Sequence, residues 1–164
     1  MSKALNKLQS KIYTLDQLID EVINWKDQNK KIVFTNGCFD LIHLGHVEVL
    51  ARSSDLGDKL IVAINSDESI AKIKGTNRPI IEEESRVKQI AALDFVDAVI
   101  LFQQDTPIKI ISSITPNVIT KGGDYKTSDV VGHEIIQGNN GEVAIIPLTQ
   151  GYSTTSILDK IKNE

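Results

Sequence analysis

Short apolar runs and amphipathic stretches alternate along most of the chain. Five runs rich in β-branched residues are too short for helices and predict strands at Ile32–Phe34, Leu60–Ile64, Ala98–Phe102, Val118–Thr120 and Val143–Pro147. Helical spacing follows at Gly45–Ser54, Glu82–Leu93, Thr106–Ser113, Asp129–Gln137 and Ser153–Lys162. Continuous apolar strands joined by helix-sized connections are typical of parallel sheets covered on both faces. The pattern therefore predicts an α/β fold of three layers around a five-stranded parallel sheet.

The region ahead of the first strand has a helical pattern of its own. Thr14 can cap a helix with Gln17 three residues on, and apolar residues follow at helical spacing, namely Leu15, Leu18, Ile19, Val22 and Ile23. No repeat or low-complexity tract divides the rest of the chain. We therefore expect residues 1–30 to form a helical extension packed on the core, and residues 31–164 to form one domain.

Composition narrows the possible partners of this domain. The 164 residues are 41% hydrophobic and 24% charged, with a formal net charge of −4, which is typical of globular proteins. No apolar run approaches the roughly 20 residues that span a bilayer. The one cysteine, Cys38, cannot form an intrachain disulfide, which fits a reducing compartment. We expect a cytoplasmic protein with no membrane or nucleic acid partner and with a small anionic ligand.

The segment after the first strand carries the candidate chemistry. In a Rossmann-like sandwich, ligands bind beyond the carboxyl ends of the strands, where the strand order reverses. Here His43 and His46 flank Gly45 at the start of a predicted helix, whose N-terminus favours anions. Gly37 and Gly45 let a backbone approach phosphate without a Cβ in the way. The spacing alone is also typical of helix-start histidines or a partial metal site. The surrounding sequence is therefore needed to choose between these roles and phosphate binding.

That context is the sequence GCFDLIHLGH, Gly37–His46, which resembles the signature of the cytidylyltransferase-like nucleotidyltransferases. The resemblance implies an HxGH-type Rossmann-like fold in which His43 and His46 contact the triphosphate and stabilise the transition state at the α-phosphorus. It gives Asp40 a pocket-ordering role, while Cys38 is interpreted as a packing residue at the nucleotide and not as a nucleophile. Further nucleotide contacts are expected from Asn36, Gly37, Phe39 and Gly45.

Three later segments extend the resemblance: Lys74–Pro79, Lys121–Tyr125 and Ser153–Ser156. Together they are similar to the adenylyltransferases of the heptose pathway, in the stand-alone form without a fused sugar kinase. These enzymes make ADP-D-glycero-β-D-manno-heptose from ATP and the heptose 1-phosphate. The serine and threonine residues also suit plain helix N-caps, so a structural role for them stays open.

Each later segment has an expected contact. Lys121 follows the fourth strand and is placed to neutralise the α-phosphate, and the turn led by Gly151 is placed to cradle the outer phosphates. We expect nucleotide contacts from Gly122, Asp124, Ser153, Thr154 and Thr155. Sugar phosphate contacts are expected from the end of the second strand and from the polar loop after it, at Asn65, Asp67, Lys74 and Arg78.

The resemblance implies that a sugar 1-phosphate attacks the α-phosphorus of ATP and that pyrophosphate leaves without a covalent intermediate. Mg²⁺ would bridge the phosphates, and because this ion needs few protein ligands, the sequence is expected to hold no dedicated protein metal site. His43, His46 and Lys121 would supply hydrogen bonds or positive charge. The resemblance also implies a homodimer.

Two other functions remain open on the sequence. The first is a cytidylyltransferase acting on glycerol 3-phosphate or phosphoethanolamine, although such enzymes usually carry an arginine where this chain has Thr149 and Gln150. The second is a noncatalytic nucleotide-sensing module, which would not require both histidines and Lys121. A fragment related to class I aminoacyl-tRNA synthetases is disfavoured, because the second lysine signature of those enzymes is missing.

Overall fold

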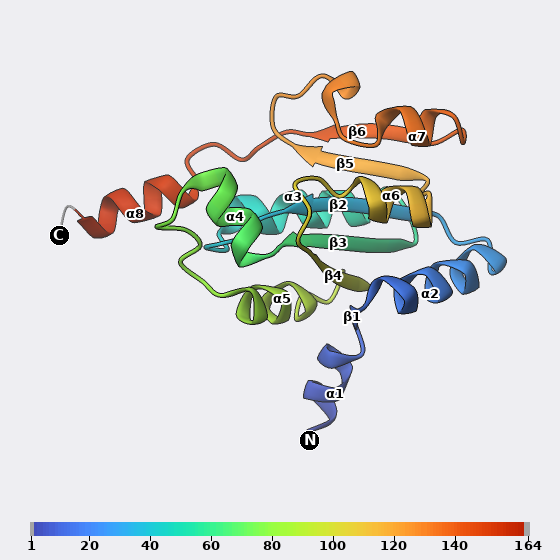
Figure 1. Ribbon diagram of the computed structural model, residues 1–164, viewed down its shortest axis with the longest axis horizontal. Helices are drawn as coiled ribbons and strands as arrows, with labels where there is room; N and C mark the ends of the chain where they lie inside the picture. The colour runs from blue at the N-terminus through green and yellow to red at the C-terminus, as the bar shows by residue number, and fades with distance from the viewer. Residues whose placement is uncertain (1, 163–164) are drawn as a thin grey trace.

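The protein is built around one parallel sheet (Figure 1). The structure, a computed structural model, describes residues 2–162. The sheet has six strands in the order β1-β4-β3-β2-β5-β6, and every neighbouring pair is parallel. Their bounds are β1 Ile12–Tyr13, β2 Ile32–Gly37, β3 Lys59–Asn65, β4 Ala98–Phe102, β5 Val118–Gly122 and β6 Glu142–Ile146.

The prediction of five strands is wrong by one, because β1 adds a sixth at the edge. Ile12 pairs with Val99 and Tyr13 with Ile100 of β4. Two residues are too few to show a hydrophobic period, so the sequence pattern could not predict this strand. It forms because the edge of β4 offers unpaired backbone groups. The predicted Rossmann-like arrangement of a parallel sheet between helices is confirmed.

Helices cover both faces of the sheet (Figure 1). On one face α2, α6 and α7 pack into one hydrophobic cluster, and on the other face α1, α3 and α5 border a second cluster. The described helices are α1 Lys3–Gln9, α2 Leu15–Asp27, α3 Leu44–Ser54, α4 Asp67–Lys74, α5 Glu83–Ala91, α6 Ile108–Ile114, the 3-10 turn η1 Thr127–Asp129, α7 His133–Gln137 and α8 Thr154–Lys162.

Two of these helices were not predicted. Most of α1 is exposed, and only Leu8 in it is partly buried, against the second cluster. Helix α4 is capped by Ser66, whose hydroxyl accepts a hydrogen bond from Ser69 N. The expectation that Lys74 lies in a loop is therefore wrong, since this residue ends α4. The helix predicted at Asp129–Gln137 divides into η1 and α7 because Gly132 takes a left-handed backbone, with φ 90°.

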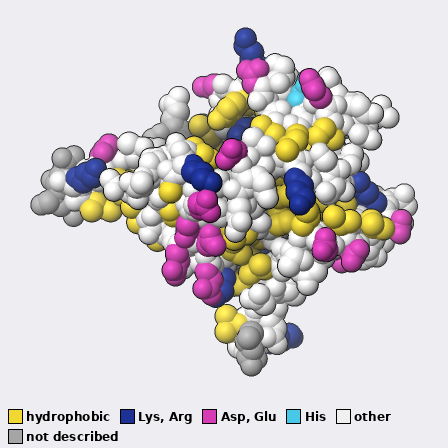
Figure 2. Space-filling view, in the orientation of Figure 1, with side chains coloured by type: hydrophobic (Ala, Val, Ile, Leu, Met, Phe, Trp, Pro, Cys, Tyr) yellow, Lys and Arg dark blue, Asp and Glu magenta, His cyan; other side chains and the backbone are white. Residues whose placement is uncertain are grey.

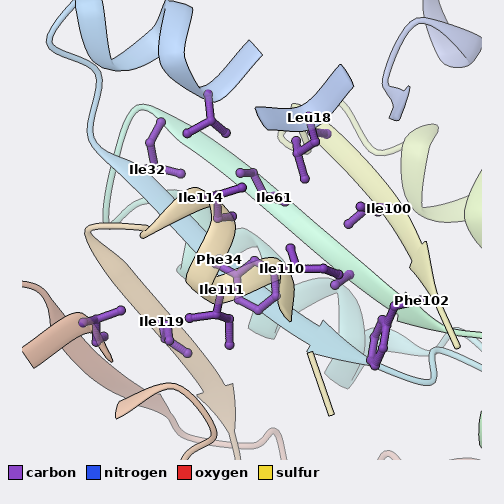
Figure 3. Close-up of a cluster of buried hydrophobic side chains, with 14 of the residues drawn as sticks. Leu18, Ile32, Phe34, Ile61, Ile100, Phe102, Ile110, Ile111, Ile114 and Ile119 are labelled. Atoms are coloured by element: carbon purple, nitrogen blue, oxygen red, sulfur yellow. The ribbon is translucent and has the colours of Figure 1, made fainter. Parts of the chain in front are cut away.

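The core explains why β2 is central. Figure 3 shows Ile32 and Phe34 of β2 among the isoleucines of α6, and Val33, between them, points to the opposite cluster. All three side chains are 0% exposed. Burying each side chain of this kind stabilises a fold by about 1.5–3 kcal/mol, which fixes the register of β2.

The N-terminal region joins the same core. The capping box predicted for α2 is present, since Thr14 accepts from Gln17 N and the Gln17 side chain accepts from Thr14 N. Leu18 and Val22 are buried against the sheet. Thus residues 2–30 contribute two helices and a strand to the sandwich, while the division of the chain at residue 30 stays a prediction.

The order of the strands determines where a ligand can bind. From β2 the chain moves outward to β3 and β4, then returns to the other side of β2 to form β5 and β6. The strand order therefore reverses between β2 and β5, and the crevice beyond their carboxyl ends is the favoured ligand site of such sheets.

The surface adds two observations. In the view of Figure 2, basic and acidic side chains are interspersed over the described part of the face, without a continuous basic stripe. Among residues 2–162, no helix is both long enough and apolar enough to cross a membrane.

Candidate active site

A hollow of about 430 Å³ opens at the reversal point between β2 and β5, and we call it the signature hollow. The end of β2, the start of α3, the end of β5 and the segment before α8 form its walls. It gathers most of the predicted site residues, namely Asn36, Gly37, Cys38, Phe39, His43, Gly45, His46, Lys74, Arg78, Lys121, Gly122, Ser153, Thr154 and Thr155.

The two histidines form a stacked pair at the start of α3. His43 is the N-cap residue, in an extended conformation, and its side chain makes no capping hydrogen bond. The rings of His43 and His46 are 3.8 Å apart between centroids and inclined by 23°, and the Phe39 ring meets His46 edge-on at 5.4 Å. The ring positions therefore depend on both the helix start and the loop before it.

Glycines make room for these rings. A Cβ at Gly45 would come within 3.1 Å of the His43 ring, and a Cβ at Gly37 would come within 3.0 Å of the Phe39 ring. Both distances are shorter than ordinary van der Waals contact. The two glycines, expected from the sequence to let phosphate approach, thus also set the aromatic packing around the histidines.

The electrostatic state of the pair suits an anion. Burial, together with the nearby His43 and Lys74, lowers the pKa of His46 to about 4. Burial also lowers the pKa of His43. Both imidazoles are therefore neutral near pH 7, and the Nδ1 atom of each is buried without a hydrogen-bond partner among the described residues. An arriving phosphate would provide the partner that these buried polar atoms lack.

Lys121 brings a cation from β5 to the same hollow. Its Nζ donates to the Asn36 carbonyl at 3.4 Å and lies 5.9 Å from the centroid of the Tyr125 ring. Burial lowers the pKa of Lys121, and no carboxylate among the described residues forms an ion pair with it. A bound phosphate would favour its charged form.

Asp40 orders the loop that carries Arg78. Its carboxylate is 2% exposed and accepts hydrogen bonds from Ile80 N at 2.8 Å and Ile81 N at 2.9 Å. Arg78 Nη1 lies 3.1 Å from Asp40 Oδ2, an ion contact without hydrogen-bond geometry. Asp40 does not line the hollow, but it keeps the Arg78 guanidinium at its edge.

Arg86 is a supporting residue that the sequence analysis missed. It is 0% exposed and donates to Cys38 O at 2.6 Å, to Ile81 O at 2.9 Å and to Asp67 Oδ1 at 2.8 Å. One side chain thereby joins the signature loop, the Arg78 loop and the start of α4. A detectable signal was present, because Arg86 interrupts the apolar face of α5 one residue before Val87.

Some predicted residues lie outside the signature hollow. Asp67 pairs with Arg86, and Asp124 is exposed and lines no part of the hollow. Asn65 is 5% exposed, donates to Ser69 Oγ at 3.0 Å and lines a neighbouring hollow. Lining residues that were not predicted as sites are Thr35, Val49, Leu148, Thr149 and Tyr152.

The segment before α8 closes the hollow from the C-terminal side. Thr149 Oγ1 is hydrogen-bonded to Glu48 of α3. Ser153 caps α8, since its hydroxyl accepts from Ser156 N at 3.0 Å and the Ser156 hydroxyl accepts from Ser153 N at 3.2 Å. The helix cap expected from the Ser/Thr run is therefore present. Ser153, Thr154 and Thr155 also line the hollow.

The described residues do not form a dedicated metal centre. Within 2–162, no group of three or more His, Cys, Asp or Glu side chains is placed to hold an ion. The cations and neutral imidazoles of the hollow instead suit a ligand that carries its own anionic groups.

Comparisons with known proteins agree with this geometry. Residues 34–160 match the sequence model described as cytidylyltransferase-like. The chain is 45% identical over 152 residues to the bifunctional protein HldE of Koribacter versatilis and 47% identical over 151 residues to that of Methylobacillus flagellatus. These alignments cover 93% and 92% of the chain but 31% of each relative, so the chain spans about a third of their length.

Solved structures extend the comparison. The chain resembles a lipopolysaccharide core biosynthesis protein from Thermoplasma volcanium, with a TM-score of 0.60 and 33% identity, over 76% of this chain and 99% of that one. A pantoate-beta-alanine ligase from Francisella tularensis, described as complexed with beta-gamma ATP and β-alanine, gives a TM-score of 0.60 at 16% identity, over 92% of this chain and 76% of that one. The second likeness concerns the fold alone.

Proposed function

The chain belongs to the cytidylyltransferase-like family of nucleotidyltransferases, and on this premise we propose that it transfers AMP from ATP to a sugar 1-phosphate. The products are an ADP-sugar and pyrophosphate. The sugar phosphate that we propose is D-glycero-β-D-manno-heptose 1-phosphate, which would give ADP-heptose.

One observation carries the proposal. Two neutral, stacked imidazoles with unpartnered Nδ1 atoms lie at a helix start, beside three cations, Lys74, Arg78 and Lys121, that line the same hollow. Such a set can donate hydrogen bonds to phosphate oxygens and offset the charge that grows on them during transfer. A volume of about 430 Å³ is also in the range of small-molecule sites.

The chemistry follows from these groups. An oxygen of the sugar phosphate attacks the α-phosphorus of ATP in line, and the bond from this phosphorus to the bridging oxygen of the pyrophosphate breaks. No enzyme nucleophile is needed, and Cys38 is not given that role. His43 and His46 bind the triphosphate oxygens, Lys121 offsets charge at the α-phosphate, and Arg78 with Lys74 attracts the acceptor phosphate. The Ser153–Thr155 turn supports the outer phosphates.

Mg²⁺ fits this arrangement as a companion of ATP. Its preferred ligands are oxygens, and it is usually bound through substrate phosphates and water with few protein carboxylates. The donor set of the hollow, which consists of cations and imidazoles, is suited to the phosphates that carry the ion. When bound, Mg²⁺ would neutralise phosphate charge.

The comparisons support the choice of acceptor. The chain is about 45% identical to part of the HldE proteins and 33% identical to a protein named for lipopolysaccharide core biosynthesis. The position ahead of Gly151 holds Gln150, without the arginine usual in the branch that uses CTP. We also propose that the enzyme acts as a cytoplasmic homodimer, which light scattering would test.

Pyrophosphate release tests the function. Purified protein with Mg²⁺ is given ATP or CTP, each with heptose 1-phosphate, glycerol 3-phosphate or phosphoethanolamine. Release with ATP and heptose 1-phosphate, lost in His46→Ala, would support the proposal. Release with CTP and one of the other two phosphates would assign a cytidylyltransferase, and ATP binding without release from any pair would favour a nucleotide sensor.

A further inference from the structure

A second hollow of about 440 Å³ lies beside the signature hollow, and we call it the side hollow. The two share a wall formed by Asn36, Gly37, Cys38, Lys74, Lys121 and Tyr125. The signature hollow continues along α3, whereas the side hollow is lined by the segments that lead into α6 and α7. They therefore lie toward opposite faces of the sheet and meet at the end of β2.

The alternation of the strands explains why the side hollow is polar at its base. Asn36, Asn65 and Lys121 each lie two residues beyond a core side chain that faces α6. Because side chains alternate along a strand, these three point to the same face at the carboxyl end of the sheet. The apolar core layer thus ends in a row of two amides and one ammonium group.

The remaining lining combines carboxylates with an apolar wall. Asp105 and Asp129 are exposed, and neither forms an ion pair with any described residue. Ile73, Val130 and Val131 line the same hollow. Carboxylates accept hydrogen bonds from hydroxyl groups, and apolar side chains pack against the C–H face of a sugar ring.

We infer that the side hollow binds the polyhydroxylated part of the acceptor, with Asp105 and Asp129 as the residues that select for sugar hydroxyls. This inference rests on the proposed function, because it assigns a place to the second substrate. The acceptor phosphate lies at the shared wall, and its ring extends toward α6 and η1.

The reaction requires this division of space. The acceptor oxygen must reach the α-phosphorus, so the two phosphates have to meet at one point while the nucleoside and the sugar extend away from it. Lys74 and Lys121 are the lysines common to both hollows, and they mark that point. The wall between the hollows is thus the place of transfer.

Charge determines which substrate occupies which hollow. A triphosphate in the side hollow would face Asp105 and Asp129, and like charges repel. In the signature hollow it meets the helix start of α3 and both histidines. The acceptor carries one phosphate group and several hydroxyls, so it can place its phosphate at the lysines and its hydroxyls at the carboxylates.

The test compares Asp105→Ala and Asp129→Ala with Asp20→Ala, an exposed carboxylate change in α2, away from both hollows. Steady-state kinetics give KM for ATP and for heptose 1-phosphate, and calorimetry gives the binding of heptose 1-phosphate and of glycerol 3-phosphate. Loss of one hydrogen bond to a charged group weakens binding by about tenfold or more. We expect that increase in the acceptor KM for each side-hollow variant, with the ATP KM unchanged and glycerol 3-phosphate affected less.

The outcomes separate this inference from the proposed function. If the wild type releases no pyrophosphate but binds heptose 1-phosphate, and the binding weakens in Asp105→Ala and Asp129→Ala, the hollow is assigned correctly and the reaction is not. If the wild type does not bind the sugar phosphate, the inference fails. It also fails if both variants bind the sugar phosphate as tightly as Asp20→Ala does, or if they weaken the binding of ATP and not that of the sugar phosphate.

Discussion

The two sides of the signature hollow are built in different ways. On one side, the loop from β2 to α3 is held by the fully buried Arg86 and by Asp40, and its neighbours belong to the core of the sheet. On the other side, α8 has no buried residue, and its start is held by the local exchange between Ser153 and Ser156. Figure 1 shows α8 projecting away from the sheet.

This contrast separates two tasks of a transferase. Groups that stabilise a transition state must be in position before the reaction, because reorganisation would cost part of the stabilisation. The histidines are on the side that the core holds. Groups that bind the outer phosphates must also release pyrophosphate, and the start of α8, which we propose for this role, is held by the hydrogen bonds between Ser153 and Ser156. If the two tasks are divided in this way, changes on the side held by the core should have larger effects than changes at the start of α8.

Replacement of Arg86 should destabilise the whole protein. Arg86→Met removes three hydrogen bonds, leaves the carbonyls of Cys38 and Ile81 without their donor and separates Asp67 from its cation. Breaking a buried charge network in this way costs about 3–5 kcal/mol. Urea denaturation followed by circular dichroism measures the change.

Lys88→Met is the matched control, since it lies in the same helix and breaks an exposed ion pair with Glu84. Such pairs contribute less than about 1 kcal/mol. Equal free energies of unfolding for the Arg86 and Lys88 variants would mean that the buried network does not hold the signature loop.

Removal of His46 should abolish most activity while leaving the fold intact. His46→Ala deletes one of the two imidazoles that we propose contact the triphosphate, and loss of one transition-state hydrogen-bond donor lowers kcat by about 10²–10³. The KM for ATP should change much less. His133→Ala, in α7, serves as the control with normal turnover. A His46→Ala enzyme with a normal kcat and a raised KM would place this imidazole in ground-state binding alone.

The side of the hollow formed by the end of β2 and the start of α3 could be predicted from the sequence, because its residues are close together along the chain. The apolar run of β2, the glycines and the two histidines lie together in ten to fifteen residues, so their adjacency follows from the strand and helix that they join. Lys121 was also predicted, because the end of β5 meets the end of β2 in any such sheet.

The sequence could not predict contacts that depend on tertiary packing. Asp67 follows β3 and was expected at the substrate, but Arg86 of α5 binds its carboxylate instead. The two-residue strand β1 has no period to detect. Asp105 and Asp129 are separated by a strand and a helix, and only the crossover of α6 brings them to one hollow.

Acidification should lower the free energy of unfolding, because His46 is buried on the side of the hollow that the core holds. Its folded-state pKa is lowered from 6.5 to about 4. Between these pH values the unfolded chain binds a proton at His46 and the folded chain does not. The free energy of unfolding therefore falls as pH drops from about 6.5 to about 4, and levels off below. The loss is on the order of 2 kcal/mol after allowance for partial solvent contact.

The measurement compares wild type and His46→Asn in urea at pH 7 and near pH 4. The asparagine does not titrate, so the variant should lose less stability on acidification than the wild type does. Other groups titrate in both proteins and cancel in the comparison. An identical pH dependence in the two proteins would show that His46 is as solvated in the folded chain as in the unfolded one.

A side-chain substitution at the start of α8 should have the smallest effect, and we expect it only in the KM for ATP. Ser153→Ala removes the hydroxyl that accepts from Ser156 N, and loss of an N-cap costs about 1 kcal/mol of helix stability. Because α8 buries no side chain, the urea midpoint should stay near that of wild type. The KM for ATP should rise about fivefold, with kcat little changed, if the capped turn must form to grip the outer phosphates. Ser112→Ala, an exposed serine in α6 that bonds only to its own helix, should change neither constant. A fall in the urea midpoint as large as that of Arg86→Met would make α8 part of the cooperative core, and the contrast between the two sides would not hold.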